Sequence, residues 1–169
     1  MTRLECPKAK DDTMNIRQAL TDDATHIAIM VKELTDEIMD RTGAHHFHVQ
    51  LDETTARCRR FLDTGLYEAF LAIEGAEVIG FVALCESHAL YAEGTFGIIQ
   101  ELYVRGAFRL AGTGGALVEA AKRHAVQKGW RRLELCTPPV PEFEPVVSFY
   151  AGRGFSVTGG RKMKCAVDR

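Results

Sequence analysis

Residues 98–117 read IIQELYVRGAFRLAGTGGAL and decide the fold. An apolar strand pattern is followed by a short basic connection and then by a glycine-rich start to an amphipathic helix. Glycines at a helix start allow a ligand to approach the backbone closely, and the first N–H groups of a helix have no partner within it. These groups also carry the positive end of the helix dipole. The stretch therefore predicts a phosphate-binding turn between a strand and a helix.

Two better-known phosphate-binding loops do not fit this stretch. A Rossmann fingerprint requires G-x-G-x-x-G near the first strand, whereas these glycines come late in the chain and have a different spacing. A Walker loop requires Gly-Lys-Ser or Gly-Lys-Thr, which the stretch lacks. A purely structural alternative is that Gly112, Gly114 and Gly115 only permit close packing of the helix on the sheet. Arg109 favours a ligand, because its charge could help to neutralise a pyrophosphate.

Hydrophobic periodicity predicts the elements around this stretch. A first strand over Met14–Leu20 precedes a helix that begins at a Thr21 cap and ends at Gly43, with an apolar stripe at helical spacing between them. Asp52 caps a shorter helix that ends near Gly65. The remaining predicted elements are strands over 67–73, 77–87 and 96–104, a helix over 112–128, a strand over 131–137, a short helix over 146–153 and closing strands over 155–167.

In the strand over 77–87, both alternating sets of positions from Val78 to Cys85 are small or apolar, so we expect this strand in the middle of a sheet that is covered on both faces. The element order β-α-α-β-β-β-α-β-α-β-β predicts an α/β (α+β) fold of one domain, with a mixed, mostly antiparallel central sheet and helices on both faces. We expect residues 1–12 to form a flexible leader and residues 13–169 to form this domain.

Composition excludes several function classes. The 169 residues carry a formal net charge of −2, which argues against a nucleic-acid partner because no basic excess is available for the phosphates. Five cysteines without a CxxC spacing indicate a reducing compartment and no zinc site. No apolar run approaches the ~18 residues that span a bilayer, and the polar start of the chain lacks the apolar region of a signal peptide. The sequence therefore predicts a cytoplasmic protein without a metal, nucleic-acid or membrane site.

Two segments resemble signatures of the GNAT acetyltransferases. Residues 109–114, RLAGTG, resemble the Q/R-x-x-G-x-G/A motif of that family, and residues 148–155, SFYAGRGF, are similar to its F-Y-x-x-x-G-F segment. The stretch Leu102-Tyr103-Val104 looks like the strand that leads into the first motif. The resemblance extends from about Met14 to the end of the chain, although specific motifs lie only within residues 98–155. It implies a GNAT-like fold and an N-acetyltransferase activity that uses acetyl-CoA as the acyl donor.

The resemblance also assigns roles to residues. Tyr150 matches the tyrosine that protonates the departing thiolate, and the backbone N–H of Val104 is the expected donor to the thioester oxygen. The backbone of Leu102 and Val104 would pair with the pantetheine arm of acetyl-CoA. The pyrophosphate would lie against Arg109 and the amides of the loop Leu110, Ala111, Gly112, Thr113 and Gly114.

Two glutamates are candidates for the general base that deprotonates the amine. Glu134 lies on a strand that carries a catalytic glutamate in relatives that acetylate protein N-termini. Glu101 lies on the strand before the pyrophosphate loop, where alternation places it opposite Gln100 and Leu102 unless a bulge intervenes. For both glutamates an exposed or salt-bridged carboxylate is the alternative, and a water chain without a dedicated base is a third.

One position that contacts the cofactor in relatives departs from the family. Phe143, in the proline-rich insertion 138–145, stands where relatives often have an asparagine that contacts the cofactor, so this contact must be made differently. His45, His46 and His48 lie in the connection between the first two helices, which borders the acceptor pocket in this fold. We interpret them as substrate contacts or ordinary loop residues rather than metal ligands.

The leading hypothesis is direct attack of a small-molecule primary amine on the thioester of acetyl-CoA. One alternative is a protein acetyltransferase that acts on lysine or N-terminal amines. Another is a non-catalytic acyl-CoA sensor, against which Tyr150 beside an intact 109–114 loop argues. The identity of the acceptor stays open because loops line acceptor pockets and diverge freely, and the assembly state, with a homodimer as one alternative, stays open too.

Overall fold

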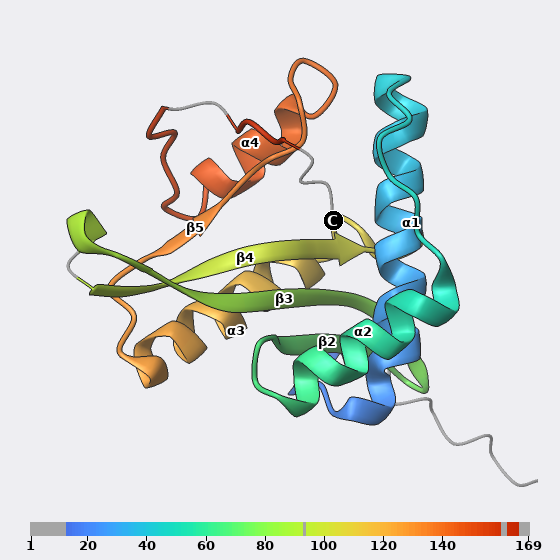
Figure 1. Ribbon diagram of the computed structural model, residues 1–169. Coiled ribbons are helices and arrows are strands. Elements are labelled where there is room, and N and C mark those ends of the chain that lie inside the picture. Colours follow the sequence, from blue (N-terminus) through green and yellow to red (C-terminus); the bar gives the residue numbers. More distant parts are fainter. Residues whose placement is uncertain (1–12, 93, 160–161, 166–169) are drawn as a thin grey trace, which may run out of the picture.

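The computed structural model describes residues 13–92, 94–159 and 162–165. Within them the strands form a five-stranded sheet in the order β1-β2-β3-β4-β5 (Figure 1). The pairs β1–β2, β2–β3 and β3–β4 are antiparallel, whereas β4 and β5 are parallel. The strands are β1 (Asn15–Gln18), β2 (Glu68–Glu74), β3 (Glu77–Ala89), β4 (Gly94–Val104) and β5 (Leu133–Leu135).

Helices cover both faces of the sheet, because β2 and β3 carry apolar side chains on each face. One buried cluster joins Leu117, Ala121 and Ala125 of α3 to the sheet, and a second joins Ile27 and Met30 of α1 to the other face. The predicted α/β fold with a mixed sheet and a central 77–87 strand is thereby confirmed. The helices are α1 (Ala24–Thr42), α2 (Leu51–Asp63), α3 (Thr113–Lys128) and α4 (Glu144–Ala151), with 3-10 turns η1 (Thr21–Asp23), η2 (Leu90–Ala92) and η3 (Gly106–Phe108).

The sheet opens between β4 and β5. Pairing of the two strands covers only Gly97–Ile99 of β4 and all of β5, whereas β4 continues to Val104. Figure 1 shows the two strands diverging from this point, with α4 beyond the gap on the β5 side. The end of β4 therefore has β3 on one side and an open edge on the side of β5.

Three details of the predicted elements are wrong. Thr21 does not cap α1, because a 3-10 turn precedes the helix; there the Asp23 carboxylate accepts a hydrogen bond from the Leu20 N–H and pairs with Arg17. Asp52 lies inside the first turn of α2, behind Gln50 at the cap position. The described residues among 155–167 contain no strand, since their side chains are mostly exposed and bury no alternating face. The predicted leader, residues 1–12, lies outside the described residues.

Candidate active site

The open edge of β4 presents the backbone of Leu102 and Val104. The Arg105 N–H donates to the Ile79 carbonyl at 2.9 Å, and Tyr103 pairs with Phe81 of β3. Backbone groups alternate in direction along an antiparallel strand, so those of the intervening Leu102 and Val104 point away from β3. An amide-bearing ligand can pair with such an edge as an additional strand. This is the arrangement that the sequence predicts for the pantetheine arm.

The loop after β4 combines two left-handed residues with a helix start. Leu110 has φ 63° and a fully exposed side chain, and Gly112 has φ 91°. Left-handed backbone is rare for a leucine, and such strained conformations cluster at ligand-binding sites. Gly112 is the cap residue of α3, so the unpaired N–H groups of the first helical turn follow it directly. The loop Leu110–Gly114 thus has the backbone geometry of an anion-binding turn.

The glycines of this loop have two different functions. A Cβ at Gly114 would lie 3.2 Å from the Phe149 ring of α4, and one at Gly115 would lie 2.8 Å from Nη2 of Arg153, just after α4, so these two glycines leave room for side chains of the α4 segment on α3. A Cβ at Gly112 would meet no described heavy atom within 4 Å. The purely structural explanation therefore holds for Gly114 and Gly115, although the segment packed against them is that of α4 and not the sheet. It does not account for Gly112, which faces open space.

Arg109 is held by the protein itself. Its guanidinium pairs with both carboxylate oxygens of Glu37 at 2.9 and 2.5 Å, and its Nε donates to the Val104 carbonyl at 2.7 Å. Its positive charge is thereby balanced by an acidic residue of α1. The contact of Arg109 with a pyrophosphate stays a prediction, and the contacts it makes here hold the loop against the end of β4.

A β-bulge sets the direction of Glu101. Ala83 pairs with Glu101 while Leu84 pairs with Ile99, so Gln100 is an extra residue in β4. Ile99 lies in the cluster under α3, whereas the bulge turns Glu101 to the opposite face, that of Ala83 and helices α1 and α2. The next positions follow from this shift: Leu102 packs toward α3 and Tyr103 toward α1.

The Glu101 carboxyl is buried with little polar compensation. The Tyr67 hydroxyl donates to its Oε1 over a long distance of 3.5 Å, and its Oε2 has no hydrogen-bond partner among the described residues. Burial raises the pKa of Glu101 from 4.5 to about 7, against smaller opposing effects of Tyr67 and the charge of Lys162. A carboxyl with this pKa exchanges a proton near neutral pH, as a general base must.

Glu134 lies in a different environment. It is opposite Ile98, in the paired part of β4 and β5. Its side chain is 42% exposed and pairs with Arg132 at 2.8 Å. This is the exposed, salt-bridged carboxylate that the sequence left as the alternative, so the geometry favours Glu101 over Glu134 as a base.

Tyr150 lies on α4, close to the start of α3. It is buried between the rings of Phe149 and Phe155, at centroid distances of 5.0 and 5.4 Å, and Phe149 also covers Gly114. Burial raises the pKa of Tyr150 to about 12, so the phenol keeps its proton at neutral pH. Phe155 packs on the α3 face of the sheet. Glu101 therefore lies on the α1 and α2 face of the sheet, whereas Phe155, which packs on Tyr150, lies on the α3 face.

Comparison with known proteins decides the family. The model of the acetyltransferase (GNAT) family matches residues 29–155. The chain belongs to the GNAT acetyltransferases. It is 32% identical over 127 residues to YhfO, an uncharacterized N-acetyltransferase of Bacillus subtilis (strain 168), which covers 73% of this chain and 78% of the relative. The chain is accordingly an N-acetyltransferase, and GNAT enzymes typically use acetyl-CoA.

Solved structures show the same GNAT fold. A ribosomal-protein-alanine N-acetyltransferase from Brucella melitensis biovar Abortus 2308 superposes with a TM-score of 0.69 at 18% identity, covering 91% of this chain and 100% of the other. A soil-metagenome aminoglycoside acetyltransferase, in complex with trehalose, superposes with a TM-score of 0.66 at 16% identity, covering 95% and 99%. At such identities the likeness concerns the fold alone.

Three residues of this GNAT site escaped the sequence reasoning. Glu37 and Arg41 lie on the polar side of α1, and Tyr67 lies just before β2. In the sequence they are ordinary polar positions, and no motif marks them. Phe143, noted only as a departure from the family, is buried with its ring centroid 4.0 Å from the Arg41 guanidinium carbon.

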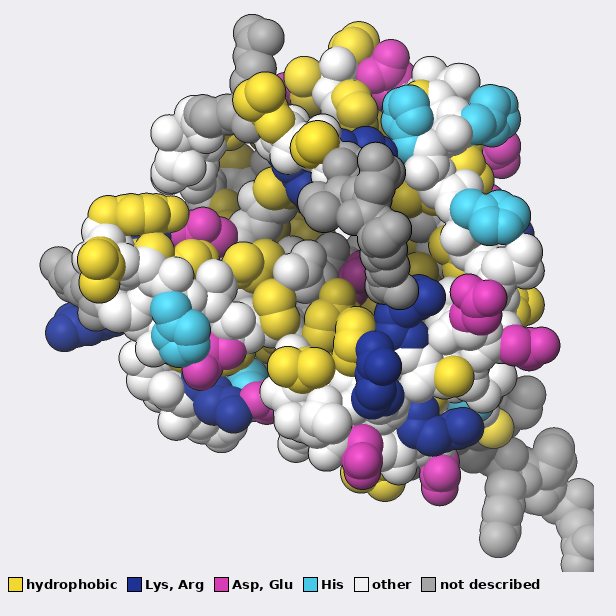
Figure 2. Space-filling model, viewed as in Figure 1, with side chains coloured by type: hydrophobic (Ala, Val, Ile, Leu, Met, Phe, Trp, Pro, Cys, Tyr) yellow, Lys and Arg dark blue, Asp and Glu magenta, His cyan; other side chains and the backbone are white. Residues whose placement is uncertain are grey.

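The three loop histidines are exposed, and histidine side chains gather on the side of the molecule where α1 ends (Figure 2). No group of three or more His, Cys, Asp or Glu in the described part of the chain is arranged to hold a metal ion. Within the same residues, every helix is too short or too polar to cross a bilayer.

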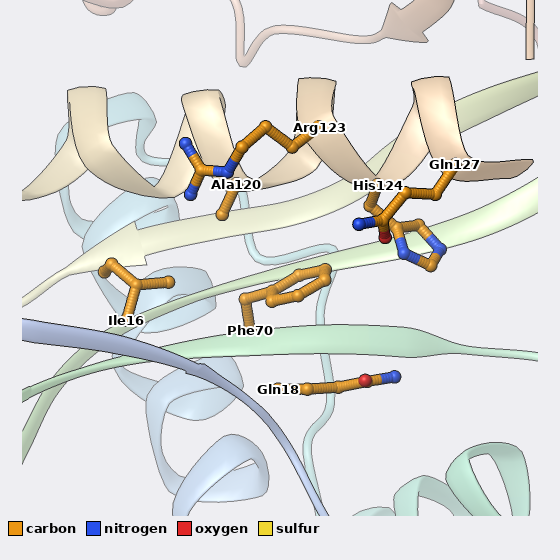
Figure 3. Close-up of a pocket in the computed structure, with 7 residues that line it drawn as sticks. All are labelled: Ile16, Gln18, Phe70, Ala120, Arg123, His124 and Gln127. Carbon is orange, nitrogen blue, oxygen red and sulfur yellow. The ribbon is translucent and has the colours of Figure 1, made fainter.

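A separate pocket lies under α3 on the β1 side of the sheet (Figure 3). Its lining includes His124, which lies 2.6 Å from Glu68 and whose pKa is lowered, mainly by burial. It contains none of the residues of the GNAT motifs and lies away from the open edge of β4. Its lining residues are Ile16, Gln18, Phe70, Ala120, Arg123, His124 and Gln127.

Proposed function

We propose that this GNAT protein transfers the acetyl group of acetyl-CoA to a primary amine of a small molecule. The observation that carries the proposal is the Glu101 carboxyl, which is buried beside the open stretch of β4 with a pKa of about 7. A carboxyl whose pKa lies near neutral pH both gains and loses a proton readily, so it is suited to remove a proton from an attacking amine.

The residues of the donor side fit acetyl-CoA. The amides of the loop Leu110–Gly114 would hold the pyrophosphate, and the open space at Gly112 leaves room for it. Leu102 and Val104 would pair with the amides of the pantetheine arm. When bound, acetyl-CoA supplies a thioester carbonyl that a nucleophile can attack.

Glu101 and Tyr150 then transfer the protons of the reaction. Glu101 takes a proton from the amine nitrogen as the new C–N bond forms, directly or through a water molecule. The Val104 N–H donates to the carbonyl oxygen as negative charge develops there. Tyr150 donates its proton to the sulfur as the C–S bond breaks, and recovers one from solvent. Glu101 releases to solvent the proton that it took from the amine. The products are an N-acetylated amine and free CoA, and both residues end in the state in which they began.

The acceptor side favours a small molecule over a protein segment. Arg41, at the end of α1, donates to the backbone carbonyl of Glu142 and stacks on Phe143, so α1 and the 138–145 loop are in contact. A protein acetyltransferase needs an open groove for an extended chain, whereas this contact joins the end of α1 to the loop before α4. The aminoglycoside acetyltransferase of similar fold is a precedent for a small-molecule acceptor.

The test is release of thiol from acetyl-CoA across a panel of amines. The panel contains aminoglycosides, linear polyamines and aromatic amines, together with lysine peptides and peptides with free N-termini. We expect turnover with one class of small amine and none above background with the peptides. Turnover with peptides alone would contradict the acceptor class, and acetyl-CoA binding without turnover on any amine would favour a sensor.

A further inference from the structure

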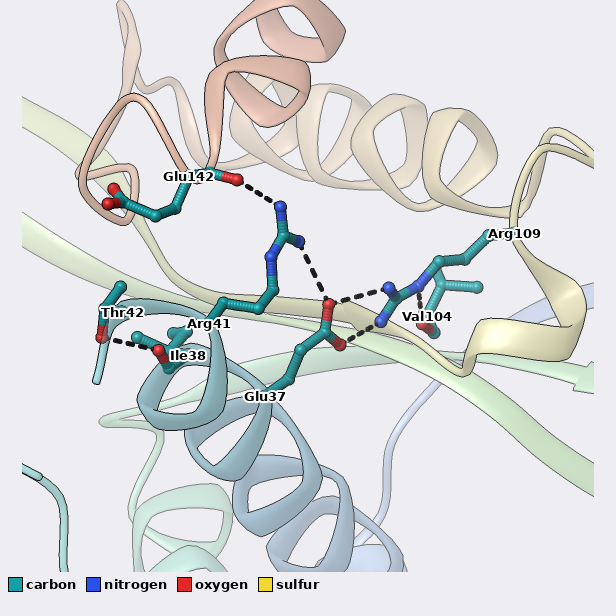
Figure 4. A network of polar contacts seen from close by, with 7 residues as sticks. All are labelled: Glu37, Ile38, Arg41, Thr42, Val104, Arg109 and Glu142. Carbon is teal, nitrogen blue, oxygen red and sulfur yellow. Dashed lines mark hydrogen bonds and ion pairs between the residues drawn. The ribbon is translucent and has the colours of Figure 1, made fainter. Parts of the chain in front are cut away.

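One carboxylate of α1 joins two loops that are far apart in the sequence. Glu37 pairs with Arg109, in the loop after β4, through both of its oxygens. Its Oε1 also accepts a hydrogen bond from Arg41 at 3.4 Å. Figure 4 shows the carboxylate lying between the two guanidinium groups, which approach it from opposite sides.

Each arginine continues the network into a different part of the site. Arg109 donates through Nε to the Val104 carbonyl, at the open end of β4. Arg41 donates to the Glu142 carbonyl and stacks on the buried Phe143 ring. The network therefore runs from the loop proposed for the pyrophosphate, through Glu37, to the loop that closes the acceptor side.

The charges make Glu37 the centre of this network. The hydrogen bonds of Arg109, and to a lesser degree Arg41, hold the pKa of Glu37 below its usual value, so the carboxylate is ionised. Its side chain is 26% exposed, which leaves the ion pairs less screened than those at the fully exposed surface. Arg–carboxylate pairs with two parallel bonds fix orientation as well as proximity.

We propose that Glu37 is a positioning residue that couples the two substrate sites. It orients Arg109, which holds the end of β4 and its loop for acetyl-CoA, and it orients Arg41, which holds the 138–145 loop over the acceptor. Because one carboxylate serves both arginines, order in one loop is transmitted to the other. This inference rests on the proposed function, since it assigns the two loops to the two substrates.

The test compares Glu37→Gln with Asp36→Asn. Asp36 is the adjacent acid of α1, and it pairs with Lys32 of the same helix, so its removal costs the same charge without touching either loop. We expect Glu37→Gln to raise the Kd of acetyl-CoA about tenfold and to raise the KM of the acceptor as well. The kcat at saturation of both substrates should change much less than either constant. Asp36→Asn should bind both substrates like the wild type.

Arg41→Gln tests the coupling itself. The contacts of Arg41 in the described residues reach Glu37 and the 138–145 loop but not residues 109–114. It should nevertheless weaken acetyl-CoA binding about threefold, and this effect should vanish in the Glu37→Gln background. The Arg41 side chain is 40% exposed, so Arg41→Gln should fold even if Glu37→Gln does not.

The outcomes separate the inference from the proposed function. If the wild type binds acetyl-CoA and Glu37→Gln behaves like Asp36→Asn, or if Arg41→Gln leaves the Kd unchanged, Glu37 does not couple the sites. Equal effects of Arg41→Gln on Kd with and without Glu37 would also overturn the coupling. If the wild type itself does not bind acetyl-CoA, the proposed function fails, and the coupling fails with it.

Discussion

Replacement of Glu101 by glutamine should make the protein more stable and less active. Burial favours the neutral carboxyl and raises its pKa from 4.5 to about 7. A carboxyl whose pKa is raised on folding does not change the stability of the folded state below the unfolded pKa. It destabilises the folded state progressively as the pH rises toward the folded pKa, and by a constant free energy above it. The difference of about 2.5 pH units corresponds to a cost of about 3 kcal/mol at pH 8. Glutamine keeps the shape of the side chain and removes this pH-dependent cost.

Denaturant unfolding at several pH values measures this cost. The stability of Glu101→Gln relative to the wild type should grow by roughly 2–3 kcal/mol between about pH 5 and about pH 8. The informative quantity is the change of this stability difference with pH, because burial of the glutamine amide contributes a free energy that does not depend on pH. Glu134→Gln is the matched control, since it makes the same substitution at a carboxylate that is 42% exposed and paired with Arg132.

The same variant should lose a factor of about 10²–10⁴ in kcat/KM for the amine at neutral pH. Acetyl-CoA binding should stay close to that of the wild type. A stability difference that does not change with pH would refute the burial argument. A Glu101→Gln enzyme that retains more than about half of the activity would refute its role as base and leave a water chain in its place.

Three further substitutions test the other parts of the site. Tyr67→Phe removes a hydrogen bond that lowers the pKa of Glu101, so the acidic limb of the pH–rate profile should move to higher pH. An acidic limb at the wild-type position would show that Tyr67 does not tune the catalytic base. Tyr150→Phe should lower kcat by about 10², the low end of general acid catalysis, because a thiolate leaves readily without a proton; a rate above about half of the wild type, with chemistry rate-limiting, would exclude Tyr150 as the acid. Gly112→Val should raise the KM of acetyl-CoA, since its side chain would enter the open space of the loop, and should also lower the melting temperature because valine is strained at φ 91°, whereas Gly114→Val should mainly lower the melting temperature by colliding with Phe149. Equal KM values for Gly112→Val and the wild type would place the pyrophosphate elsewhere.

Periodicity and local motifs predicted most of the fold. The small or apolar pattern of residues 78–85 predicted that this strand lies in the centre of the sheet, and Gly43 and Gly129 end their helices in the left-handed conformation that favours glycine. The closing strands over 155–167 were wrong where the structure describes them. Strand-like alternation there was not supported by a buried face, which depends on tertiary contacts that a local pattern does not contain.

The sequence predicted those parts of the candidate site that a contiguous stretch of backbone forms. It did not predict the contacts between side chains that are far apart in the sequence. The loop 109–114 is contiguous in the sequence, so the pattern of its glycines predicts its backbone conformation. The bulge at Gln100, which turns Glu101 toward α1 and α2, depends on register with β3 and has no signature in residues 98–104 alone. The partner of Arg109 lies on α1, and no local rule connects it to Glu37.

Thermal unfolding with and without acetyl-CoA tests the central claim most directly. A ligand at about 100 times its Kd adds ~2.7 kcal/mol to the stability of the state that binds it. For a chain of this size that corresponds to a rise of roughly 5–10 °C in the melting temperature. ATP at the same concentration is the control for nonspecific binding of a polyanion, and it should give a much smaller rise. A melting temperature unmoved by saturating acetyl-CoA, or moved equally by ATP, would contradict the assignment of the open β4 edge and the 110–114 loop to this cofactor.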